Sequence, residues 1–149
     1  DDLARHAPDL SIGGDFEFFG RPEWEAIRST YGLEFAERQQ YQSTFMYSAV
    51  DSGDVDVISA FTSDGRIAAY DLVVLDDPRQ AIPTYDAVLL LSPQAAEDPV
   101  ILRALQPLIG AIDDPAMREA NRIVDVDGES ISAAAEYLRE QGTAPDADN

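Results

Sequence analysis

The chain has 149 residues, of which 29 are acidic and 10 basic, so its formal net charge at pH 7 is −19. Nucleic acids and anionic membrane surfaces are bound through concentrated positive charge, so this composition argues against both as partners. Apolar residues make up 45% of the chain, near the average for globular proteins, which excludes a purely disordered acidic segment. The absence of cysteine excludes disulfides, thiolate metal sites and cysteine nucleophiles.

The first part of the chain predicts strands that alternate with helices. Pro22 suits a first helical turn, and Trp24, Ile27 and Tyr31 recur at helical spacing until Gly32 ends the pattern. In chain order, the expected elements are a strand at 10–13, a helix at 22–31, an extended segment at 33–38, a helix at 45–53 and a β-branched, buried strand at 55–61.

The second part begins with two further apolar runs and then becomes helical. The expected elements are a turn at 62–65, a short helical piece at 67–70, strands at 72–75 and 87–91, and helices at 99–110, from 114 onward, and at 130–141. This order indicates an α/β fold with a central sheet flanked by helices and extra C-terminal helices. Residues 143–149 are small and acidic, and we expect a disordered tail there.

Catalytic and metal-binding motifs give no positive indication. His6 is the only histidine, so a serine–histidine–aspartate arrangement would depend on one terminal residue. The carboxylate pairs at 54/56 and 76/77 are expected to be solvated turn and cap residues, and a hydrolase that uses them is the enzymatic alternative. The segment 125–128 starts like a calcium loop but lacks its later ligands. We expect no enzyme activity, no metal and no cofactor.

Aromatic and arginine side chains near strand ends are more informative. Phe61 ends a predicted strand, Tyr85 precedes another, and Arg21 stands before the first long helix. In open α/β sheets ligands lie outside the strand ends, so these three side chains could converge there. The alternatives are a core position for Phe61, a packed loop position for Tyr85 and a surface ion pair between Arg21 and Glu25. From the residues alone, the chain is an α/β domain with a candidate edge for a small ligand.

Four segments resemble a known family. The stretch 55–77 (VDVISAFTSDGRIAAYDLVVLDD), together with 83–87 (PTYDA), 16–22 (FEFFGRP) and 117–127 (MREANRIVDVD), is similar to the substrate-binding proteins of osmoprotectant ABC importers, which bind glycine betaine, carnitine or choline. The resemblance extends from about residue 10 to residue 142. It implies one lobe, the second, of a type II periplasmic-binding-protein-like fold at residues 1–142, without a counterpart of the first lobe.

The resemblance also implies a ligand site without catalytic residues. Family members enclose a trimethylammonium group in aromatic side chains, and two of these positions correspond to Phe61 and Tyr85. Phe61 replaces the usual tyrosine, and Thr84 replaces the second proline of the turn before Tyr85. An arginine that binds the ligand carboxylate corresponds to Arg21. The ring faces suit a cation that has no N–H to donate, and a guanidinium suits a carboxylate.

The expected function is therefore binding of quaternary-ammonium compatible solutes for ABC-type import in osmoprotection. The implied partners are the quaternary amine, the missing first lobe and the ABC permease subunits. The implied location is the periplasm or the extracellular face of the cell membrane, as a secreted, lipid-anchored or permease-fused protein. The alternative is an interaction module without a role in transport, which associates with itself or with a partner through the exposed cleft face.

Overall fold

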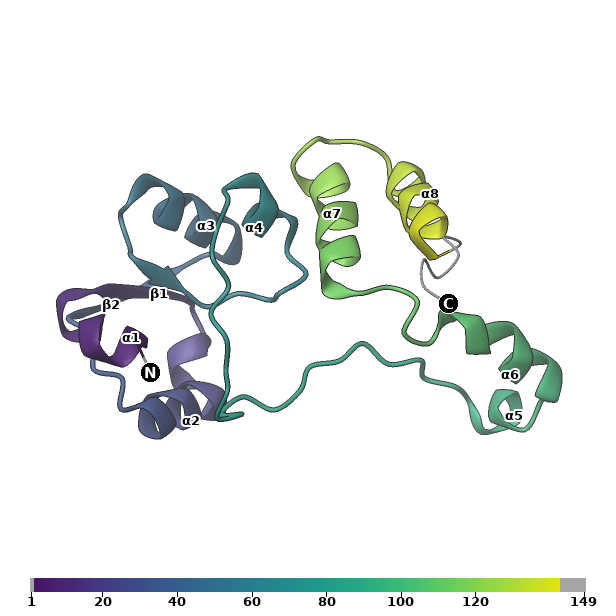
Figure 1. Ribbon diagram of the computed structural model, residues 1–149, viewed down its shortest axis with the longest axis horizontal. Helices are drawn as coiled ribbons and strands as arrows, with labels where there is room; N and C mark the ends of the chain where they lie inside the picture. Colours follow the sequence, from purple (N-terminus) through teal and green to yellow (C-terminus); the bar gives the residue numbers. More distant parts are fainter. Residues whose placement is uncertain (1, 143–149) are drawn as a thin grey trace, which may run out of the picture. The chain divides into compact units, whose positions relative to one another are not determined.

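The computed structural model describes residues 2–142, which form two compact units (Figure 1). Unit 1 contains residues 2–61 and 70–84, and unit 2 contains residues 62–69 and 85–142. Each unit is described by itself. The predicted division into a lobe at 1–142 and a tail at 143–149 stays a prediction, because the tail lies outside the described residues.

A three-stranded parallel sheet forms the centre of unit 1. Its order is β2-β1-β3, with β1 at Ser11–Asp15, β2 at Glu37–Tyr41 and β3 at Val57–Ile58. Ser11 pairs with Glu37 on one side of β1, and Ile12 pairs with Val57 on the other. Helix α2 (Pro22–Tyr31) connects β1 with β2, and α3 (Ser43–Ser52) connects β2 with β3. The two helices lie on opposite sides of the sheet (Figure 1), which confirms the predicted α/β class.

The ends of the helices in unit 1 follow the predicted signals. Pro22 occupies the first turn of α2, and Gly32 ends the helix in a left-handed conformation with φ +66°. Gly53 ends α3 in the same way, with φ +80°. Since only glycine adopts this conformation without a steric penalty, these two residues determine where each helix stops. Before β1, the short helices α1 (Asp2–His6) and η1 (Ala7–Asp9) lead into the strand.

Trp24 is the centre of an aromatic cluster in unit 1. It is buried, and its ring lies 5.7 Å from that of Phe18, 5.3 Å from that of Phe19 and 6.3 Å from that of Phe35, measured between centroids. Phe18 and Phe19 belong to the short helix η2 (Phe18–Gly20), directly before α2. Edge-on and tilted ring pairs add to the free energy of burial, so this cluster fixes η2 against α2.

Two predicted strands, 72–75 in unit 1 and 87–91 in unit 2, are wrong for the described structure. Both segments are irregular and pair with no strand in the described part of the chain. Their side chains are largely exposed, with Val73 at 84% and Leu90 at 93%. A β-branched or leucine-rich run favours a strand only where a neighbouring strand accepts its backbone hydrogen bonds, and no described strand does so here.

Other boundaries also differ from the prediction. The strand expected at 55–61 is limited to Val57–Ile58, and the segment expected at 33–38 becomes a strand only from Glu37. The helix expected at 99–110 divides into α6 (Pro99–Leu105) and η3 (Gln106–Leu108). Pro107 explains this division, because proline has no N–H for an interior helical hydrogen bond.

Unit 2 is built from helices. Helix α4 (Gly65–Ala69) packs against α7 (Asp114–Asp125), and α7 packs against α8 (Ile131–Gly142). Helix α5 (Pro93–Ala96) packs against α6. The Asp113 carboxylate accepts a hydrogen bond of 2.8 Å from the backbone N–H of Ala116 and so caps α7, one residue before the predicted start. Among the described residues, no helix combines the length and the apolar character needed to cross a membrane.

Candidate ligand-binding site

Exposed phenylalanines follow all three strands of the sheet in unit 1. Phe16 comes directly after β1, Phe45 lies in the first turn of α3 just after β2, and Phe61 comes three residues after β3. Their exposed fractions are 64%, 60% and 64%. Because the carboxyl ends of parallel strands meet at one edge of a sheet, this edge carries three accessible aromatic rings. Such an edge is the usual place for a small ligand in an α/β sheet.

Sequence reasoning found one of these rings and missed two. Phe61 was predicted, and its exposure rules out the alternative that it is a core residue. In the sequence, Phe16 stands out only as the first residue of the segment 16–22 that resembles the family, and Phe45 only as the first residue of the helix expected at 45–53. The signal that could have found them is their common position, immediately after a strand. That position could be recognised only once β2 was known to extend to Tyr41.

Hydrogen bonds hold the turn after β1 in place. The Asp15 carboxylate accepts a bond of 2.8 Å from the backbone N–H of Glu17 and another of 2.8 Å from that of Phe18. The Gln40 side chain, on β2, donates a bond of 3.2 Å to the carbonyl oxygen of Phe16. The backbone that carries Phe16 is thus bound both to its own turn and to the neighbouring strand, which limits the directions its ring can take.

Arg21 lies at the N-cap position of α2, close in sequence to the same edge. Its Nη2 donates a bond of 2.7 Å to the Glu17 carboxylate, and 41% of its side chain is exposed. This hydrogen bond to Glu17 raises the pKa of Arg21 above its ordinary value. The ion pair expected with Glu25 is therefore replaced by one with Glu17.

Arg21 also lines a groove of about 590 Å³ along α2. The aromatic residues of this groove are Phe19, Trp24 and Phe35, and its other charged residues are Glu25, Arg28, Glu34 and Arg38. Phe61 is absent from its described lining. The structure thus places Arg21 and Phe61 in the same unit but does not join them in one cavity.

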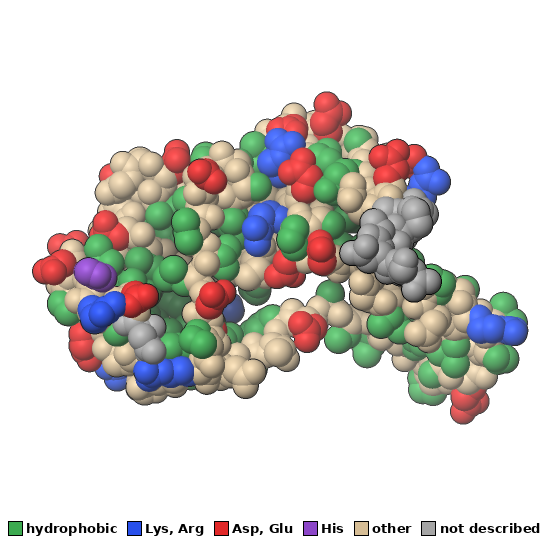
Figure 2. All heavy atoms as spheres, viewed as in Figure 1, with side chains coloured by type: hydrophobic (Ala, Val, Ile, Leu, Met, Phe, Trp, Pro, Cys, Tyr) green, Lys and Arg blue, Asp and Glu red, His purple; other side chains and the backbone are tan. Residues whose placement is uncertain are grey.

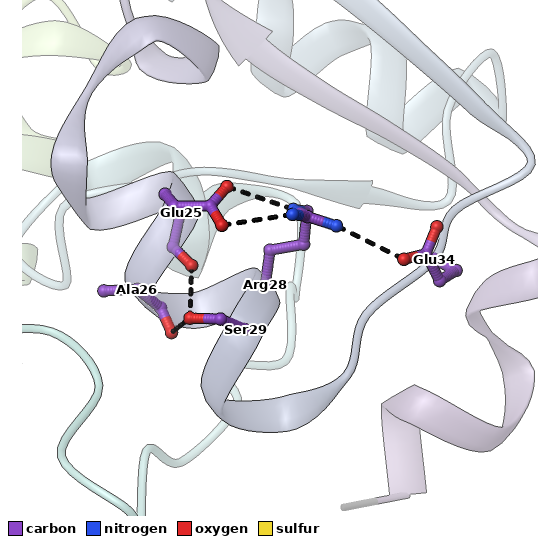
Figure 3. A network of polar contacts seen from close by, with 5 residues as sticks. All are labelled: Glu25, Ala26, Arg28, Ser29 and Glu34. Carbon is purple, nitrogen blue, oxygen red and sulfur yellow. Dashed lines mark hydrogen bonds and ion pairs between the residues drawn. The ribbon is translucent and has the colours of Figure 1, made fainter.

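A second arginine in this groove is already neutralised (Figure 3). Arg28 donates two bonds of 3.1 Å to the Glu25 carboxylate and one of 3.3 Å to that of Glu34. The hydrogen bonds from Arg28 lower the pKa of Glu25. The Ser29 hydroxyl donates a bond of 2.7 Å to the Glu25 carbonyl oxygen, which completes the network. Arg28 is thus committed to two carboxylates, whereas the ion pair described for Arg21 is the exposed one with Glu17.

Tyr85 belongs to unit 2, in the irregular segment that follows Pro83. Its side chain is 59% exposed, which rules out the alternative of a packed loop tyrosine. The assignment of Arg21, Phe61 and Tyr85 to one site stays a prediction, since Tyr85 lies in a different unit from the other two.

The segment 62–66, central to the family resemblance, has a structural role in unit 2. The Arg118 Nε donates a bond of 2.8 Å to the carbonyl oxygen of Thr62, and the Asn121 amide donates one of 2.8 Å to that of Ser63. A Cβ atom on Gly65 would lie 2.3 Å from the backbone nitrogen of Arg122. Glycine is therefore required where α4 meets α7, because the two backbones nearly touch.

One carboxylate of each pair considered for catalysis serves the fold. Asp56 accepts bonds of 2.8 Å from the backbone N–H of Ser11 and 2.7 Å from its hydroxyl, and these bonds lower the pKa of Asp56. Asp77 accepts from the Tyr31 hydroxyl and from the backbone N–H of Ile82 at 2.8 Å. Both link segments that are distant in the sequence. Among the described residues, no group of three or more histidine, aspartate or glutamate side chains could hold a metal ion.

Three relatives and a solved structure show what the chain is similar to. It is 28% identical to an ergothioneine transport permease and binding protein of Helicobacter pylori, over 84% of this chain and 23% of that protein. It is 31% identical to a glycine-betaine-binding protein of Pseudomonas aeruginosa, over 85% of this chain and 42% of that protein. It is 27% identical to a carnitine transport binding protein of Listeria monocytogenes, over 93% of this chain and 46% of that protein. A crystal structure of a glycine betaine/carnitine/choline ABC transporter superposes with a TM-score of 0.82 at 31% identity, over 93% of this chain and 52% of the other.

Residues 1–140 match the family described as the substrate-binding domain of ABC-type glycine betaine transport systems. This match covers nearly the whole chain and confirms the resemblance found in the sequence. It also confirms that the chain is not an enzyme, because the family consists of substrate-binding domains. The chain spans less than half the length of the curated relatives described above. The protein belongs to the family of substrate-binding domains of ABC-type glycine betaine transport systems.

Proposed function

We propose that the protein binds quaternary-ammonium compatible solutes, such as glycine betaine, choline or carnitine, for an ABC-type importer. The observation that carries this proposal is the set of three exposed phenylalanines at the carboxyl edge of the sheet, in a chain that belongs to a family of glycine betaine transport. Family membership further supports a location in the periplasm or at the extracellular face of the cell membrane, and an ABC permease as partner.

The chemistry of the ligand explains why rings at this edge are useful. A trimethylammonium group has no N–H, so hydrogen bonds cannot select it, and it is attracted instead by the negative faces of aromatic rings. Each ring contributes about 0.5–2 kcal/mol, depending on how well water is excluded. In the proposed site, Phe16, Phe45 and Phe61 of unit 1 contact the ammonium group.

Arg21 is the proposed partner of the ligand carboxylate. Its present ion pair with Glu17 is exposed, and exposed pairs contribute about 0–1 kcal/mol to stability, so exchanging Glu17 for a ligand carboxylate costs little. The guanidinium offers two parallel N–H donors that match a carboxylate, which a single ammonium group does not. Arg21 would therefore act on betaine and carnitine but not on choline, which has no carboxylate.

A complementary part of the binding protein belongs to the proposal. Relatives that bind glycine betaine or carnitine are more than twice as long as the matched region. The part proposed to complete the site is a first lobe. Without it, a few rings and one charge-assisted contact should give only millimolar affinity, because association itself has an entropic cost. Self-association through exposed apolar surface is the alternative interaction.

Ergothioneine is a second candidate ligand, favoured by the match with the Helicobacter pylori protein over 84% of this chain. It is itself a trimethylammonium betaine with a carboxylate, so the same rings and arginine would suit it. Its additional heterocycle requires space that glycine betaine does not need. The two candidates can be separated by a displacement experiment, in which amide chemical shifts show which of the two ligands binds more tightly to the same site.

An NMR titration of the ¹⁵N-labelled chain tests the proposal. Choline should shift the amides of Phe16, Phe45 and Phe61 in fast exchange, with millimolar affinity. The control ligand is 3,3-dimethylbutan-1-ol, which has the shape of choline but no charge, and it should bind at least ~5-fold more weakly if cation–π attraction dominates. Equal binding of the two compounds, or no shift with choline, glycine betaine or ergothioneine, would refute the proposed cage.

A further inference from the structure

Glu17 supplies a carboxylate to Arg21, the residue that is proposed to bind the carboxylate of the ligand. The Arg21 Nη2 donates a hydrogen bond of 2.7 Å to a Glu17 carboxylate oxygen, four residues earlier in the chain. Nη2 contributes an N–H to each of the two edges through which a guanidinium holds a carboxylate by two parallel bonds. The contact that Glu17 makes is therefore of the same kind as the contact proposed for glycine betaine or carnitine.

The backbone around η2 keeps Glu17 within reach of Arg21. The Gly20 N–H donates a bond of 2.9 Å to the Glu17 carbonyl oxygen, and the Arg21 N–H donates one of 3.1 Å to that of Phe18. The Asp15 carboxylate accepts the backbone N–H of Glu17 at 2.8 Å. Because the two side chains belong to one short, hydrogen-bonded turn, Glu17 faces Arg21 at a high effective concentration, and a dissolved carboxylate has to compete with it.

The fold of this turn does not depend on the Glu17 carboxylate. Glu17 is the N-cap residue of η2, but its side chain makes no capping hydrogen bond to the described residues. The turn is held instead by backbone bonds and by Asp15, and the Glu17 side chain is 76% exposed. Removing a charge from so exposed a position changes the free energy of unfolding little. The described interaction of this carboxylate is with Arg21, so its role concerns Arg21 rather than the structure of the turn.

Further acidic residues lie near Arg21. The hydrogen bond to Glu17 is the largest influence that raises the pKa of Arg21, and the charges of Asp15 and Glu23 raise this pKa as well. Over the face shown in Figure 2, arginine side chains (blue) are interspersed with acidic ones (red), in keeping with the net charge of −19. A ligand carboxylate that approaches Arg21 therefore meets like charge, whereas a cationic ligand meets opposite charge.

We infer that Glu17 is a specificity-determining residue, whose carboxylate occupies Arg21 as an internal competitor and so disfavours ligands that carry a carboxylate relative to choline. The inference rests on the proposed function for the identity of the ligands, but competition between carboxylates for Arg21 does not depend on that function. An exposed ion pair changes an equilibrium constant by up to about fivefold, so removing Glu17 should strengthen the binding of glycine betaine by about this factor. Choline has no carboxylate, and its binding should change little.

Glu17→Gln tests the inference, because the amide keeps the length of the side chain and removes its charge. In an NMR titration of the ¹⁵N-labelled chain, the variant should bind glycine betaine ~3- to 5-fold more tightly than the parent chain, and choline within ~2-fold of it. In an Arg21→Ala background, the same substitution should change the affinity for glycine betaine less than ~1.5-fold, because the group that Glu17 occupies is gone.

Glu37→Gln is the matched control. It removes an equal charge from an exposed position in the same unit, at the start of β2 and thus at the end of the strand opposite the carboxyl edge. It should change the affinity for either ligand less than ~1.5-fold.

Acetate tests the competition without a quaternary ammonium group. At constant ionic strength, the chemical shift of the Arg21 Nε–H should change with acetate concentration at least ~2-fold more steeply in Glu17→Gln than in the parent chain.

Several results would overturn the inference. Equal gains for glycine betaine and choline would indicate a general effect of charge, and an unchanged or lower affinity for glycine betaine would show that Glu17 does not compete with the ligand. A gain that persists without Arg21, or an equal response of the two chains to acetate, would also contradict it. If acetate distinguishes the two chains while neither glycine betaine nor choline binds, the proposed ligand is wrong and the competition at Arg21 is confirmed.

Discussion

Replacing Gly65 with alanine should destabilise unit 2 through a backbone collision. The added Cβ would lie 2.3 Å from the backbone nitrogen and 2.5 Å from the Cα of Arg122, and 2.7 Å from the carbonyl carbon of Asn121. All three atoms belong to the backbone of α7, so no side-chain rotation relieves the contact, and α4 and α7 must separate.

The magnitude follows from three contributions. Overpacking of a tight contact costs about 1–3 kcal/mol. Separation of α4 from α7 also strains the bonds from Arg118 and Asn121 to the turn at 62–63, each with a net contribution of about 0.5–1.5 kcal/mol. Alanine recovers up to about 1 kcal/mol through its better helix propensity. The expected net loss in the free energy of unfolding is about 2 kcal/mol.

Hydrogen exchange of the α4 and α7 amides measures this loss, and about 2 kcal/mol corresponds to exchange ~30-fold faster. Gly20→Ala is the control, because a Cβ on Gly20 meets nothing within 4 Å. It should leave exchange in α4 and α7 unchanged. If Gly65→Ala accelerates exchange less than ~2-fold, the close approach of α4 and α7 is not a tight constraint, and the structural role assigned to the segment 62–66 is wrong.

Three further predictions concern unit 1. Burial raises the pKa of Asp77, but hydrogen bonds from Tyr31 and from backbone N–H groups outweigh it, so the net pKa lies below its ordinary value. Ionised Asp77 therefore stabilises the fold above the unfolded pKa near ~3.9 and loses this effect as pH falls through the lower folded value. Asp77→Asn should destabilise unit 1 at pH 7 and reduce the dependence of the free energy of unfolding on pH below about pH 4. Urea unfolding followed by Trp24 fluorescence at several pH values would measure both effects. If the variant loses stability below pH 4 as steeply as the parent chain, the role assigned to Asp77 is wrong. Arg21→Ala should weaken the binding of glycine betaine ~10-fold and that of choline less than ~2-fold in the NMR titration. Equal losses of affinity for the two ligands would show that Arg21 does not bind the ligand carboxylate. Phe61→Ala should weaken the binding of choline ~3- to 30-fold, whereas Phe61→Tyr should retain it. If the tyrosine variant binds choline as weakly as the alanine variant, the face of the ring has no role in binding.

Local signals were sufficient for helices α2 and α3 of unit 1 and for the family, but not for the short helices α1, η1 and η2. Helix α2 begins at Pro22 and ends before Gly32 as predicted, because the fixed φ of proline and the left-handed φ of glycine act within one or two residues. The stretch 55–77 contributed to the family resemblance, although the packing of its segment 62–66 against α7 was not visible in the sequence. That packing depends on a contact with a helix more than fifty residues away.

The two failed strands show the limit of such signals. Residues 72–75 and 87–91 have strand composition, but a strand exists only when another segment supplies the hydrogen bonds of a ladder, and composition says nothing about that partner. The same holds for the candidate site. The sequence alone singled out Phe61 as a candidate ring for the proposed quaternary ammonium ligand. Only the parallel topology of β2-β1-β3 decided that Phe16 and Phe45 share an edge with it, because strand order is set by long-range pairing.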